Sequence, residues 1–205
     1  MKPQIHGWFI GAAAGALLAG CSQMQSGATI GQPAPAAVSN LVDDWPAKPR
    51  EAASAMIAKY GQPHEATPTM LVWHNVGPWK HTILSRDEIP HDFPKSHTDL
   101  LEQSIDYRVP VDKFDELAGY DGSVIVERTK GELSARCDKE EMNFLALNLA
   151  HDIVTGRRTV EDARRFYAET AMAFMRGEKP AYTQRLQFEV RSGAADRDVP
   201  FMPGR

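Results

Sequence analysis

Residues 138–177 read DKEEMNFLALNLAHDIVTGRRTVEDARRFYAETAMAFMRG and contain two consecutive helix patterns. Gly156 and Gly177 follow the two patterns at the positions where helices commonly end. Asp138 with Glu141, and Thr159 with Asp162, have the spacing of helix-capping pairs. The first pattern is apolar over more than half of its circumference, which is typical of a central core helix. These apolar residues are Met142, Leu145, Ala146, Leu147, Leu149, Ala150, Ile153 and Val154.

The segments before this helix pair are rich in β-formers. Strands are expected at 69–74 and 79–84 around Gly77-Pro78, at 104–109, at 123–129 and 132–137 around Lys130-Gly131, and at 186–190. Helical pieces are expected at 49–60 and 111–118. This order predicts an α+β fold with two layers, in which two long C-terminal helices pack on a mostly antiparallel sheet.

Composition divides the chain around this folded region. Residues 21–44 are rich in Ser, Gln, Gly, Ala and Pro and show no sustained apolar period, which indicates a flexible tether. Residues 192–205 indicate a loose C-terminal tail. A single α+β domain is therefore expected over residues 45–191. It is long enough to bury a hydrophobic core without stabilisation by disulfide bonds or a structural metal ion.

Residues 1–20 have the layout of a secretory signal peptide, with Lys2 followed by an uncharged apolar run and then small residues. The run is shorter than the roughly 20 residues that a transmembrane helix needs. Leu18-Ala19-Gly20-Cys21 resembles the lipobox of bacterial lipoproteins, in which the cysteine is acylated and becomes the new N-terminus. The resemblance implies attachment through Cys21 to the periplasmic face of a membrane, and Ser22 after the cysteine favours the outer membrane.

Charge and cysteine content exclude several classes of protein. The whole chain carries 23 Lys and Arg against 27 Asp and Glu, a formal net charge of −4, and removal of Lys2 with the signal peptide makes it −5. A nucleic-acid partner is not expected from this balance. Cys21 is assigned to lipid, so Cys137 has no disulfide partner within the chain. Phosphate loops, nucleophile elbows, zinc-protease motifs and Cys-x-x-Cys motifs do not occur in the sequence.

Histidines are concentrated in one part of the chain, with five of them between residues 64 and 97. If the first hairpin turns on Gly77 and Pro78 alone, His74 lies opposite His81, and opposed side chains have Cβ atoms about 5 Å apart. Two imidazoles at that separation can share one transition-metal ion. Further ligands are then expected from His91, His97 or Asp99 in the following loop. Surface histidines without a ligand are the alternative.

Cys137 suggests a second hypothesis. It lies just before a helix start, where the helix dipole favours a thiolate, and His151 lies further along that helix. Its alternation with Leu133 and Ala135 instead predicts an inward-facing, unreactive cysteine. Asn143 falls within the apolar arc of the first helix, where its amide must find hydrogen-bond partners.

The sequence is compatible with two functional classes. The first is a membrane-anchored periplasmic lipoprotein that binds an envelope partner or has a structural role, with no enzymatic activity and no cofactor. The second is a metal-binding protein or metal-dependent enzyme that uses the histidines and one transition-metal ion.

Overall fold

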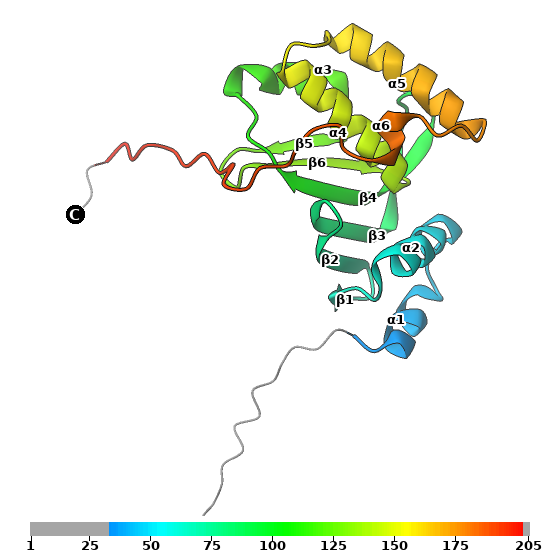
Figure 1. Ribbon diagram of the computed structural model, residues 1–205. Helices are drawn as coiled ribbons and strands as arrows, with labels where there is room; N and C mark the ends of the chain where they lie inside the picture. Colours follow the sequence, from blue (N-terminus) through cyan, green and yellow to red (C-terminus); the bar gives the residue numbers. More distant parts are fainter. Residues whose placement is uncertain (1–32, 203–205) are drawn as a thin grey trace, which may run out of the picture. The chain divides into compact units, whose positions relative to one another are not determined.

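The computed structural model describes residues 33–202, which form a six-stranded antiparallel sheet with helices packed on it (Figure 1). The strand order is β1-β2-β3-β4-β6-β5. The strands are β1 (Glu65–Ala66), β2 (Met70–Val76), β3 (Trp79–His91), β4 (His97–Asp106), β5 (Val124–Glu127) and β6 (Glu132–Cys137). The helices are α1 (Pro35–Val42), α2 (Ala47–Tyr60), the 3-10 turn η1 (Val111–Lys113), α3 (Phe114–Tyr120), α4 (Glu140–Val154), α5 (Val160–Met175) and α6 (Ala181–Gln184). The predicted α+β fold, with its antiparallel sheet and two long C-terminal helices, is confirmed.

The first hairpin has the predicted register. Val76 pairs with Trp79 and His74 pairs with His81, so Gly77 and Pro78 alone form the turn. Gly77 has a φ of +56°, a backbone conformation that residues other than glycine rarely adopt. A Cβ at this position would also meet the ring of Tyr60, so the turn requires glycine for two reasons.

β3 and β4 form a hairpin that the sequence does not predict. β3 continues to His91 and β4 begins at His97, where the sequence predicts a loop between strands at 79–84 and 104–109. The sequence does not predict that β3 continues beyond residue 84, because the polar run Ser85–Glu88 interrupts the alternation of apolar and polar residues by which a strand is recognised. The pairing of β3 with β4 shifts between Leu84 and Ile89, so the strand is irregular at this run. The hairpin tip brings its histidines beside β6.

Helix α4 forms the centre of the core, as its apolar arc predicts. Leu145, Leu147, Leu149 and Ile153 are fully buried, and α4 packs against β6, β4 and β5. Helix α5 lies mainly against α4 and α3. Thr159 caps α5 by accepting a hydrogen bond from the backbone N–H of Asp162, as predicted. The predicted cap of α4 by Asp138 and Glu141 is wrong, since Lys139 occupies the N-cap and its side chain forms no capping bond.

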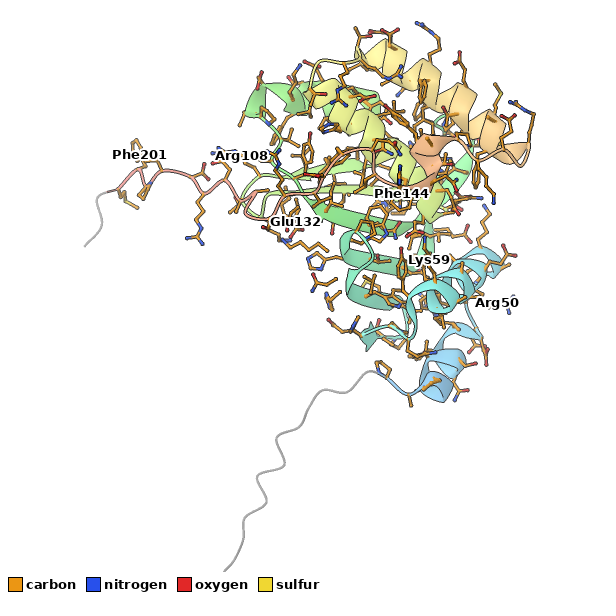
Figure 2. The ribbon with its side chains drawn as sticks, viewed as in Figure 1. Arg50, Lys59, Arg108, Glu132, Phe144 and Phe201 are labelled. Carbon is orange, nitrogen blue, oxygen red and sulfur yellow. The ribbon has the colours of Figure 1, made fainter. Side chains whose placement is uncertain are left out.

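Helices α1 and α2 cover a second apolar cluster on β2, β3 and β4, whose buried strand residues include Leu71, Trp73, Leu84 and Leu101. The segment 35–42 is helical, although its composition predicts part of an irregular tether. Packing explains the difference, because Val38 is buried in this cluster and a short helix gains most of its stability from tertiary contacts. The side chains of α2 also reach α4, since Nζ of Lys59 lies 5.8 Å from the centre of the Phe144 ring (Figure 2).

The predicted last strand at 186–190 is wrong. This segment has no regular structure and lies against α4, where the Asn148 side chain accepts a hydrogen bond from the backbone N–H of Gln187. The same side chain donates to the carbonyls of Tyr182 and Arg185. Side-chain hydrogen bonds thus take the place of a strand partner. Further on, Asp196 forms ion pairs with Arg108 and Arg128.

Among residues 33–202, no helix has the length and apolar character needed to cross a membrane. The predicted signal peptide, the lipobox and Cys21 lie outside the described residues.

Candidate metal centre

The tip of the β3–β4 hairpin places two histidines and a carboxylate together. His91 ends β3 and pairs across the ladder with His97, which begins β4, and the centres of their rings lie 4.9 Å apart. Asp99 follows on β4 two residues later. One potential ligand atom from each of these three residues lies within 4.8 Å of the others. Cys137 joins them from the end of β6, which pairs with β4 through Leu101.

The separations within this group suit ligands of one ion. Nε2 of His97 lies 3.1 Å from Oδ1 of Asp99 and 3.4 Å from Sγ of Cys137. Nδ1 of His91 lies 3.3 Å from Oδ2 of Asp99. Zinc bonds of about 2.0–2.3 Å in tetrahedral geometry place two ligands about 3.3–3.8 Å apart. His91, His97 and Asp99 are therefore close enough to share one ion, whereas Cys137 contacts His97 alone and would have to move toward the other two residues to join them.

The outer nitrogen of each histidine lies beside an oxygen atom. Nδ1 of His97 lies 2.9 Å from the carbonyl oxygen of Lys95, and because a carbonyl can only accept, Nδ1 must donate. In the neutral ring this leaves the lone pair on Nε2, the nitrogen that faces Asp99 and Cys137. Nε2 of His91 lies 3.6 Å from Oδ1 of Asp121, beyond hydrogen-bond distance, and Nδ1 of His91 lies 3.3 Å from Oδ2 of Asp99. An outer hydrogen bond such as that of His97 orients the histidine ligands of metal sites.

The Asp99 carboxylate carries an unsatisfied oxygen. The residue is only 1% exposed. Its Oδ2 accepts a hydrogen bond from the Ser123 hydroxyl, whereas its Oδ1 has no hydrogen-bond partner among the described residues. The approach of Oδ1 to Nε2 of His97 is close but lacks the alignment of a hydrogen bond. A buried carboxylate oxygen without a hydrogen bond is costly unless a cation compensates its charge, and in the metal-free protein the nearby His97 imidazolium is that cation, whose place a metal ion would take.

Charges inside the group alter its protonation. The Asp99 carboxylate, and after it the Cys137 sulfur, raise the pKa of His97 to about 11 in the metal-free protein. Burial opposes the ionised form of Asp99, but its contacts with His97 and Ser123 outweigh burial, and the pKa of Asp99 is lowered. Burial raises the pKa of the Cys137 thiol above its usual value, so the free thiol is favoured over the thiolate.

A pocket of about 110 Å³ reaches the group from the side of α5. His97 and Cys137 form part of its wall, together with the apolar side chains of Met142, Tyr167 and Phe174. The pocket therefore borders the side chains of His97 and Cys137.

The structure divides the predicted ligand residues into two groups. His74 and His81 face each other as predicted, but His81 pairs with Ser104 and His91 pairs with His97, seven residues apart on β4, or about 24 Å along a strand. His91, His97 and Asp99 therefore form a group of their own at the hairpin tip. A single site that combines both groups does not form.

The sequence hypothesis that pairs Cys137 with His151 is wrong. Nδ1 of His151 lies 2.8 Å from the Tyr107 hydroxyl, on the far part of α4, and Cys137 instead contacts His97. The predicted burial of Cys137 is confirmed, with 5% of the residue exposed. The arrangement also differs from a catalytic triad, in which the carboxylate and the nucleophile contact different nitrogens of the histidine. Here both Asp99 and Cys137 face Nε2.

Three members of this environment are not recognisable from the sequence. Cys137 joins β4 only through the pairing of β6, and Asp121 and Ser123 come from the connection between α3 and β5. They follow no spacing motif. Comparison with protein-family models, curated proteins and solved structures finds no match to this chain.

Proposed function

We propose that the protein binds one zinc ion through His91, His97 and Asp99, with Cys137 as the fourth ligand, and that it does so as a lipid-anchored protein of the bacterial envelope. The observation that supports this most directly is Oδ1 of Asp99, a buried carboxylate oxygen without a hydrogen-bond partner among residues 33–202. It lies among two imidazoles and near a thiol, in a group of potential ligands.

The set of donor atoms favours zinc over other common ions. Two imidazole nitrogens, a carboxylate oxygen and a thiolate form a mixed set that tetrahedral Zn²⁺ accepts. Ca²⁺ and Mg²⁺ prefer six or more oxygen ligands, which the group does not supply. Zinc would also displace the thiol proton of Cys137 and satisfy the Asp99 oxygen.

The experiment is a measurement of zinc content and melting temperature of the full chain in detergent, with and without a chelator. We expect one zinc per chain, and saturation about 1,000-fold above the dissociation constant should add about 4 kcal/mol of stability, or about 10 °C in melting temperature. His91→Ala and His97→Ala should lose the ion and the zinc-dependent shift.

His151→Gln is the matched control, because His151 is a partly buried histidine that bonds Tyr107 and lies outside the group. It should keep one zinc per chain. Zinc-free protein that shows the same melting temperature with and without added zinc would overturn the proposal. Zinc retained by both His91→Ala and His97→Ala would do the same.

The anchor is supported by the lipobox resemblance alone, and it is tested separately. Cells fed a radiolabelled or alkyne-tagged fatty acid should incorporate label into the wild-type chain, and Cys21→Ser should abolish incorporation and release the protein from membranes. Equal labelling of the two chains would reject lipidation at Cys21 without affecting the zinc proposal.

A further inference from the structure

A second pair of histidines faces another part of the sheet surface. His74 on β2 and His81 on β3 are directly paired, and their Nδ1 atoms lie 3.3 Å apart. The rings stand almost at right angles, with an interplanar angle of 87°. Their side chains are 37% and 35% exposed, so the pair is open to solvent.

An acidic residue lies beside the outer nitrogen of each histidine. Nε2 of His74 lies 2.6 Å from Oε1 of Glu65, and Nε2 of His81 lies 3.6 Å from Oε1 of Glu132. A carboxylate accepts hydrogen bonds, so in the neutral ring Nε2 of His74 keeps its proton and Nδ1 of His74 carries the lone pair. Nε2 of His81 lies beyond hydrogen-bond distance from its carboxylate, so Nδ1 of His81 can donate to Nδ1 of His74. A metal ion that displaced this proton would meet the lone pairs of both Nδ1 atoms.

The separation of the two Nδ1 atoms matches a metal site as well as a shared proton. Two metal–nitrogen bonds of about 2.0–2.1 Å in tetrahedral geometry place the nitrogens about 3.3–3.4 Å apart. The carboxylate–histidine contacts are the outer-shell arrangement that orients histidine ligands. Solvent exposure leaves room for water to complete the coordination.

His64 is the nearest other histidine, but it does not belong to the pair. Its Nδ1 accepts a hydrogen bond from the backbone N–H of His74 at 3.1 Å, and this occupies the lone pair. The centres of the His64 and His74 rings lie 5.8 Å apart. His64 therefore provides a matched control for the two histidines of the pair.

We propose that His74 and His81 form a second, solvent-exposed metal site that binds Cu²⁺. Imidazole nitrogen is a good copper ligand, and Cu²⁺ is bound most tightly of the divalent first-row ions by a given set of nitrogen and oxygen ligands. The site does not depend on the buried group, which lies about 24 Å away along the sheet and supplies none of these ligands. The proposal therefore stands whether or not the buried group binds zinc.

The test is a titration of the full chain in detergent with Cu²⁺, followed by electron paramagnetic resonance and electron spin echo modulation, which counts coordinated imidazoles. Because the buried group also holds two imidazoles, the signal is assigned in a His97→Ala background, where we expect one Cu²⁺ with two imidazoles. In that background, His74→Ala and His81→Ala should lose the two-imidazole signal and bind Cu²⁺ more than about 100-fold more weakly. Glu65→Gln, which changes only an outer contact, should weaken binding by about 10-fold or more.

Two control variants separate this site from its surroundings. His64→Ala and His97→Ala, which changes the buried group, should both keep the two-imidazole signal. The proposal is overturned if the wild type gives no such signal, or if His74→Ala and His81→Ala both retain it in the His97→Ala background. Loss of the signal in His97→Ala, with circular dichroism unchanged, would also overturn it, because the copper would then belong to the buried group.

Discussion

Replacing Glu140 by Ala is expected to lower the free energy of unfolding by about 3–5 kcal/mol. The Glu140 side chain is 4% exposed and begins α4. Its Oε1 accepts hydrogen bonds from the Tyr60 hydroxyl at 2.5 Å, Nε1 of Trp79 at 2.6 Å and Nε2 of Gln103 at 3.3 Å. Its Oε2 forms an ion pair with Lys59. Alanine would leave several buried donors without an acceptor at the junction of α2, the sheet and α4.

Two further variants divide this effect into its parts. Lys59→Met removes the ion pair and the contact of Nζ with the Phe144 ring, and leaves the buried Glu140 charge to its neutral donors. Because Lys59 is half exposed, we expect a loss of about 1–2 kcal/mol, smaller than for Glu140→Ala. Glu140→Gln keeps an acceptor oxygen, so its loss in free energy of unfolding should lie between those of Lys59→Met and Glu140→Ala. Urea unfolding followed by circular dichroism measures all three. A loss below about 1 kcal/mol for Glu140→Ala would mean that water or rearranged neighbours satisfy the donors.

Replacing Asp99 by Asn is expected to weaken zinc binding more than about 100-fold, because the substitution removes the anionic ligand and keeps the volume. Ser123→Ala removes only the hydroxyl that supports Oδ2 of Asp99, and should cost about 10–100-fold. Asp92→Asn is the matched control, since Asp92 is an exposed acid beside His91 that bonds Ser96. Competition with a chromophoric chelator measures all three affinities. An Asp99→Asn affinity within tenfold of the wild type would exclude Asp99 as a ligand.

The same variant should change how the stability of the metal-free protein depends on pH. The raised pKa of His97, about 11 when folded against 6.5 for an ordinary histidine, arises first from Asp99. The contact of imidazolium with carboxylate therefore contributes fully below pH 6.5, and its contribution declines as pH rises toward 11. Chelated wild type should lose more stability between pH 6.5 and 8 than chelated Asp99→Asn. Equal losses in the two proteins would contradict this assignment.

Local sequence signals predicted the parts of the fold that depend on neighbouring residues. The apolar arc of α4, the glycines that follow α4 and α5, and the Thr159 cap are patterns within a few residues of each other, and the structure confirms each of them. Gly77-Pro78 likewise determined the register of the first hairpin, which places His74 opposite His81. Such signals suffice because a turn and a helix periodicity are set by short-range geometry.

Other features depended on contacts between distant segments. The helix at Pro35–Val42 forms where Val38 is buried against β2, β3 and β4. Residues 186–190 form no strand and lie against α4, where Asn148 accepts a hydrogen bond from the backbone N–H of Gln187. Asn143 shows the same dependence, since its amide donates to Gln103 and to the carbonyl of Leu101.

The sequence alone identified His91, His97 and Asp99 as candidate ligands, through the concentration of histidines in one stretch. Only the tertiary structure separated them from His74 and His81, because β3 extends to its full length between the two groups. Only the tertiary structure brought Cys137 to His97, 40 residues away along the chain. A metal centre of this kind depends on the order of strands in the sheet, and strand order is decided by how the whole core packs, which no local pattern encodes.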